Sequence, residues 1–130
     1  MALLEAFCLR ESAGKITPAL FQQLRAFHGD LVAARQRKDA VGAASLDGQF
    51  HLAMCRASGL PHTLHIIQNL FDRGEYYRII MHARRGGFAT ESLKEHATIL
   101  RAMERGDLDR TAKAIENHRL RAMRRLEETA

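Results

Sequence analysis

Apolar residues recur every three or four positions along most of the chain, which is the period of an amphipathic α-helix. The clearest example follows Pro18, where Leu20, Leu24, Phe27 and Leu31 fall on one stripe. No segment alternates apolar and polar residues as a half-buried strand would. The pattern therefore predicts an all-α protein.

Glycine, proline and capping residues divide this pattern into six helices. The first covers residues 2–12 and stops at Gly14, and the second opens at the pair Thr17–Pro18. The others are expected over 39–59, 61–85, 90–105 and from 107 onward, with Asp39, Thr90 and Asp107 as N-caps, breaks at Gly59, Gly86–Gly87 and Gly106, and a kink at Gly74. The loops are only about two to six residues long, so we expect an antiparallel bundle of about six helices.

The apolar stripes also nominate core residues. The third helix should bury its stripe around Phe50, and the fifth should bury the residues around His96. Further core candidates are Val41, Leu46, Met54, Leu64, Ile67, Leu70, Phe71, Ile99, Met103, Ala112, Ile115, Leu120 and Met123.

The length of 130 residues suits a single domain with a sizeable core, here residues 1–130. No apolar run approaches the roughly 18 residues that a membrane span needs, and the first residues do not form a signal peptide. A cytoplasmic protein is expected. Cys8 and Cys55 form no disulfide framework or zinc-ribbon spacing, so we expect reduced, half-buried core residues.

The formal net charge of +5 raises the question of nucleic-acid binding. Basic residues are spread along the chain, and the densest cluster, Arg119 to Arg125, lies on a helix that also carries glutamates. Aromatic residues make up only 6%, which leaves few platforms for stacking bases. A solvated helix face is the better interpretation, and this chain is not expected to read DNA itself.

One carboxylate and three imidazoles fall on inward-facing positions of three predicted helices. Asp47 and His51 are four residues apart and share a helix face. His96 and His118 lie on the apolar stripes of two later helices. Together they form a ligand set that suits a divalent transition metal such as Zn, Ni or Mn. Taken singly, Asp47–His51 also fits an ion pair, and each histidine fits a hydrogen-bonded core residue.

Three functions remain open on the residues alone. The chain can be a metal-dependent binding domain, a hydrolase-like metalloenzyme that activates water, or a metal-free helical interaction module. A hydrolase usually needs a separate general base near the metal, and no persuasive one is evident.

Two segments carry a resemblance to a known family. DGQFHLAMCRASG resembles the D-x-x-F-H-x-x-L-x-x-A-S-G signature of the FCD domain, the all-helical effector-binding domain of GntR-type transcriptional regulators. EHATILRAMERGDLDRTAKAIENH resembles that family's pattern around its later histidines, and LLEAFCLRESA resembles its first helix. The resemblance covers nearly the whole chain.

The resemblance implies a sensor domain and not an enzyme. Its metal ligands would be Asp47, His51, His96 and His118, with a small organic acid bound at or beside the metal. It also implies a homodimer, and contact with DNA only through an N-terminal winged helix-turn-helix domain that we expect this chain to lack. Leu60 departs from the family, which usually has Asn there.

A carboxylate effector needs a cation or hydrogen-bond donors beyond the metal. Arg73 and Arg78 lie among core positions of the fourth predicted helix, and Arg78 is the preferred candidate. Tyr77 is a candidate hydroxyl donor. His62, His65 and His82 are not expected to be ligands. Gly48 is unusual inside a helix, where it costs about 1 kcal/mol relative to Ala.

Overall fold

The computed structural model describes residues 1–84 and 87–128. Six helices hold most of these residues, and the described part contains no strand. They are α1 (Ala2–Glu11), α2 (Pro18–Gln36), α3 (Ala40–Arg56), α4 (Pro61–Ala83), α5 (Gly87–Glu104) and α6 (Leu108–Glu128). The predicted all-α bundle of six helices is confirmed.

Capping residues define the helix ends largely as the sequence predicts. Thr17, Asp39 and Asp107 each accept a hydrogen bond from a backbone N–H in the first turn of the following helix, at 2.9–3.1 Å. Gly59 and Gly106 follow the ends of α3 and α5 with φ of +69° and +72°. This left-handed conformation favours glycine, which explains why both helices stop there.

The predicted start of the fifth helix is wrong. Thr90 is not its N-cap, because α5 already begins at Gly87. A cap-like residue inside a helix is easily mistaken for a start when the preceding turn contains glycine. The break predicted at Gly86 lies outside the described residues.

Four predicted core residues are also wrong. The exposed fractions are 61% for Val41, 39% for Leu70, 41% for Leu120 and 53% for Met123. Each lies on the solvent side of its helix, because a stripe's periodicity does not show which of its edges meets a neighbouring helix.

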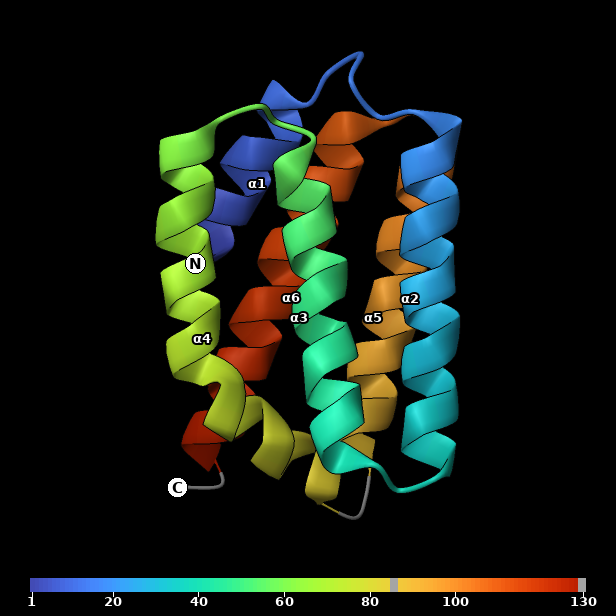
Figure 1. The fold of residues 1–130 in the computed structure, drawn as a ribbon, viewed down its shortest axis with the longest axis vertical. Helices are drawn as coiled ribbons and strands as arrows, with labels where there is room; N and C mark the ends of the chain where they lie inside the picture. Colours follow the sequence, from blue (N-terminus) through green and yellow to red (C-terminus); the bar gives the residue numbers. More distant parts are fainter. Residues whose placement is uncertain (85–86, 129–130) are drawn as a thin grey trace.

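The helices form two layers of three. Figure 1 shows α4, α3 and α2 side by side in front of α1, α6 and α5, and the main packing pairs within the layers are α2–α3, α3–α4, α1–α6 and α5–α6. The second half of α4 leaves the line of its first turns and runs toward α5 (Figure 1), in the half of the helix where the sequence predicts a kink.

The main core lies between the layers. All helices but α4 contribute its fully buried members, which include Leu9, Leu24, Phe50, Ile99 and Ile115. A second cluster joins α1, α3 and α4 and contains Cys8 and Cys55, which are free and fully buried where half-burial was expected. Within the described residues, no helix combines the length and apolar character that crossing a membrane requires.

Candidate metal centre

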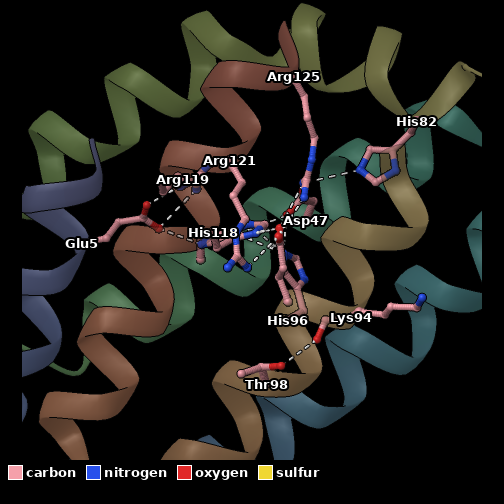
Figure 2. Close-up of polar contacts among 12 residues, drawn as sticks. Glu5, Asp47, His82, Lys94, His96, Thr98, His118, Arg119, Arg121 and Arg125 are labelled. Atoms are coloured by element: carbon pink, nitrogen blue, oxygen red, sulfur yellow. Dashed lines mark hydrogen bonds and ion pairs between the residues drawn. The ribbon is translucent and has the colours of Figure 1, made fainter. Parts of the chain in front are cut away.

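The fold brings the four predicted metal ligands together between the two layers. Asp47 and His51 come from α3, His96 from α5 and His118 from α6, and each of these residues is at most 5% exposed. One nitrogen or oxygen atom from each lies within 4.8 Å of the corresponding atoms of the others. Figure 2 shows Asp47, His96 and His118 converging on one point.

Phe50 helps to fix the orientation of this cluster. Its fully buried ring stacks on His96 at 4.6 Å between centroids, with only 6° between the ring planes. Because Phe50 packs into the core from α3, it sets the rotation of that helix and directs Asp47 and His51 inward.

Four close contacts join the inner atoms of the cluster. His96 Nε2 lies 3.3 Å from His51 Nε2 and 3.2 Å from His118 Nε2. Asp47 Oδ1 lies 3.3 Å from Nε2 of both His51 and His96. The shared centre is therefore lined by three ring nitrogens and one carboxylate oxygen.

Two glutamates contact the outer ring nitrogens. His51 Nδ1 lies 2.7 Å from Glu5 Oε1, and His118 Nδ1 lies 3.1 Å from Glu95 Oε1. An ionised carboxylate only accepts hydrogen bonds, so each Nδ1 must carry the proton. In the neutral rings the Nε2 lone pairs of His51 and His118 then point at the centre, as they do in metal-binding histidines.

Arginines of α6 keep both glutamates ionised. Arg119 donates to Glu5, and Arg125 donates to both oxygens of Glu95, at 2.8 and 3.0 Å. Burial alone would raise the pKa of Glu5, but Arg119 and His51 outweigh it and hold the pKa below its ordinary range. The pKa of Glu95 falls to about 2, because His118 and Arg125 outweigh the opposing effect of burial.

Three of the proposed ligands, Asp47, His96 and His118, favour their proton-free forms. Burial lowers the pKa of His96 to about 3 and also lowers the pKa of His118. Burial opposes ionisation of Asp47, but the nearby rings of His51, His82 and His96 keep its pKa well below the usual range. Neutral imidazoles and an ionised carboxylate are the forms that bind a metal ion.

The geometry and chemistry of this group fit a divalent transition metal. Converging lone pairs repel one another unless a cation lies between them, and buried Asp47 Oδ1 has no hydrogen bond within the described chain. Four of the distances between these atoms are 3.2–3.3 Å, so an ion with bonds of about 2.0–2.2 Å can reach both atoms of each such pair.

A cavity of about 270 Å³ adjoins the cluster. Asp47 and His118 form part of its wall, as do Arg78, Tyr77 and Ser92. The Arg78 guanidinium donates to the backbone carbonyl of Phe71 at 2.8 Å, while its buried Nε has no hydrogen-bond partner in the part of the chain described.

The three predicted effector residues are placed differently. Arg78 is half-buried at the cavity, and Tyr77 is 57% exposed at its wall. Arg73 is exposed and is not among the residues that line this cavity, because it projects from another face of α4.

Sequence reasoning missed the roles of Glu5, Glu95 and His82. His62 and His65 are exposed, but His82, which the sequence does not single out from them, is buried with Nε2 3.4 Å from Asp47 Oδ2. The only signals available were a carboxylate within the apolar first helix and the Glu95–His96 pair. Neither shows which histidine the carboxylate would meet.

Comparisons with known proteins identify the family of the chain and a solved structure with the same fold. The FCD domain family matches residues 1–122. The structure is similar to E. coli McbR/YncC, with a TM-score of 0.86 and 16% sequence identity, over 99% of this chain and 65% of that one. This likeness shows a shared fold, and the chain spans about two thirds of that protein's length. No curated protein sequence matches the chain. The chain therefore belongs to the FCD domain family, the all-helical domain of GntR-type transcriptional regulators.

Proposed function

We propose that the chain is the metal-dependent, organic-acid-sensing and dimerisation domain of a GntR-type regulator. The observation that carries the proposal is the convergence of three buried ring nitrogens and one carboxylate oxygen, at 3.2–3.3 Å for the closest pairs, beside a cavity whose wall includes Arg78. Asp47, His51, His96 and His118 would hold Zn, Ni or Mn.

The cavity supports a small carboxylate as the effector. The bound metal would supply positive charge and open coordination positions to that carboxylate. Arg78 would add a charge-assisted hydrogen bond through its free Nε, and Tyr77 a hydroxyl donor. Arg73 is a weaker candidate because it is exposed away from the cavity.

The regulatory output would be a change in the arrangement of a homodimer. A ligand shifts such an arrangement only by its difference in affinity for the two states. DNA would be read in the cytoplasm by a separate N-terminal winged helix-turn-helix domain, with this domain setting the spacing of the two copies.

A thermal-unfolding series tests the metal site. Zn or Ni should raise the melting temperature of chelator-treated protein, because a ligand that binds only the folded state stabilises it. His96→Ala should abolish the rise and keep the fold, whereas His65→Ala, at an exposed position on α4, should leave it intact. A wild-type chain without any rise would contradict the metal site and favour a metal-free interaction module.

A panel of mono-, di- and tricarboxylates on the metal-loaded protein tests the effector class. A hydrogen bond to a charged group contributes about 1.5–3 kcal/mol, so Arg78→Gln should weaken binding about 10- to 100-fold. Arg73→Gln is the matched control on the same helix and should bind as wild type does. Metal-dependent turnover of esters or phosphates would instead favour a hydrolase.

A further inference from the structure

His82 lies near the C-terminal end of α4 and is 6% exposed, yet it is not one of the four proposed ligands. Its Nε2 faces Asp47 Oδ2 at 3.4 Å, as the dashed line in Figure 2 shows. We infer that His82 is a positioning residue of the metal centre, which engages Oδ2 of Asp47 so that Asp47 binds the ion through Oδ1 alone. The inference rests on the proposed metal site and adds a residue to it.

The two oxygens of Asp47 have different surroundings. Oδ1 faces the ring nitrogens of His51 and His96 at 3.3 Å, whereas Oδ2 faces only His82 among the hydrogen-bonding contacts of the described residues. An ionised carboxylate only accepts hydrogen bonds, so Nε2 of His82 must be the protonated nitrogen. A donor on Oδ2 competes with bidentate binding and stops the carboxylate from rotating.

The ring of His82 has no competing polar role in the described chain. Its Nδ1 is buried without a hydrogen-bond partner there, so Asp47 is the hydrogen-bonding partner that the described residues offer to the ring. Burying an imidazole that makes only one hydrogen bond costs folding free energy. A role in orienting Asp47 accounts for a histidine at this position despite that cost.

The backbone of His82 is also anchored. Its carbonyl oxygen accepts a hydrogen bond from Arg35, which links the end of α4 to α2. His82, the donor to Asp47, is therefore fixed by contacts that do not involve α3. The orientation of the Asp47 carboxylate then depends on α4 as well as on its own helix, α3. Removing groups that orient a metal ligand typically weakens metal binding about 10- to 100-fold.

The inference is tested by measuring the affinity of the full chain for Zn and for Co, in competition with a chelator. His82→Phe keeps a buried ring and removes the donor, so it should weaken binding about 10- to 100-fold. His82→Gln retains an amide N–H near the position of Nε2 and should recover most of that loss. His65→Phe, at an exposed site on the same helix, is the control and should bind as wild type does.

Two spectroscopic readouts separate positioning from general destabilisation. The visible absorption of the Co-loaded protein should change in His82→Phe, because the freed Oδ2 alters coordination by Asp47, and should be restored in His82→Gln. In the metal-free wild type, nitrogen NMR should find His82 as the Nε2–H tautomer. If His82→Phe does not fold, the tautomer measured in the wild type tests the inference by itself. A ring protonated at Nδ1 would overturn it.

The outcomes distinguish this inference from the proposed function. A wild-type chain that binds no metal overturns both. Wild-type binding with equal affinity and an equal Co spectrum in His82→Phe overturns the positioning role alone. A loss in His82→Phe as complete as that in His96→Ala, without recovery in His82→Gln, would also overturn it, because His82 would then be a ligand.

Discussion

Gly48 and Gly74 both lie close to the Arg78 side chain, but at different distances. A Cβ atom at Gly48 would lie 3.4 Å from Arg78 Nη2 and 3.9 Å from a ring carbon of Phe71. At Gly74, one turn before Arg78, a Cβ would lie 3.2 Å from Arg78 Nη1. Glycine at position 74 therefore leaves room for the Arg78 guanidinium, whereas a Cβ at position 48 would make only an ordinary contact with it.

The replacement Gly48→Ala should stabilise the protein. Alanine is better than glycine inside a helix by about 1 kcal/mol, and a methyl group 3.4 Å from Arg78 makes an ordinary contact. Urea unfolding measures the change. Gly29→Ala, in an open position on α2, should give a similar gain and serves as the reference. A destabilised Gly48→Ala would mean that the Arg78 contact cannot relax.

Among the elements, α1 is joined to the metal centre through one buried residue. Glu5 is 1% exposed and contacts both His51 of α3 and Arg119 of α6. Arg119 in turn lies over the ring of Phe71 on α4, 4.6 Å from its centroid. A short N-terminal helix thus helps to hold the tautomer of a proposed metal ligand.

Glu5→Gln should destabilise the fold strongly. It removes the negative charge that compensates Arg119, and breaking a buried pair in this way costs about 3–5 kcal/mol. The control is Glu116→Gln, which removes the partially exposed Arg10–Glu116 pair between the same two helices and should cost less than about 1 kcal/mol. Urea unfolding of both variants checks the prediction, and equal effects would refute it.

Helix α4 would connect the cavity with the proposed metal centre. Arg78 and His82 are one turn apart on it, the first at the cavity wall and the second against Asp47. An effector carboxylate that accepts a hydrogen bond from Arg78 would therefore contact the same half of α4 that carries His82, the proposed donor to Asp47. This arrangement favours mutual strengthening of metal and effector binding.

On the scale of the whole molecule, most of the exposed large apolar side chains in the described residues lie on three helices, with Val41 on α3 apart from them. They include pairs that share a helix face, which are Leu3 and Phe7 on α1, Ile66 and Leu70 on α4, and Leu120 and Met123 on α6. Helix α1 packs against both α4 and α6. Such exposed apolar residues are typical of a surface that a partner covers.

We expect the chain to form a homodimer through the exposed apolar pairs of α1, α4 and α6. The double variant Leu3→Asp/Ile66→Asp should weaken this dimer, because the variant places two negative charges among these apolar residues. Sedimentation measures the dimer dissociation constant, and a loss of at least about tenfold corresponds to about 1.4 kcal/mol. Val41→Asp on α3 is the control, since Val41 is equally apolar, 61% exposed and outside these pairs. A wild-type monomer, or equal loss in both variants, would contradict this interface.

The sequence alone determined the helices and the inward registers of four polar residues. Both are local properties, since caps act within one turn and an apolar stripe defines which residues share a face. Helical period therefore places Asp47, His51, His96 and His118 on inward faces, but it does not separate them from buried His82, and the family resemblance is what selects the four. The same information misjudged Val41 and Leu70, because a stripe does not reveal which of its edges a neighbour covers.

Only the tertiary structure decided how these residues meet. The contact between His82 and Asp47 joins positions 35 apart in the chain, and the contact between Glu5 and Arg119 joins positions 114 apart. Such pairs depend on how the helices are placed and rotated against one another, which is set by the packing of the whole core. Helical period identifies inward-facing residues, but packing alone selects the tautomers, the cavity and the donor that positions Asp47.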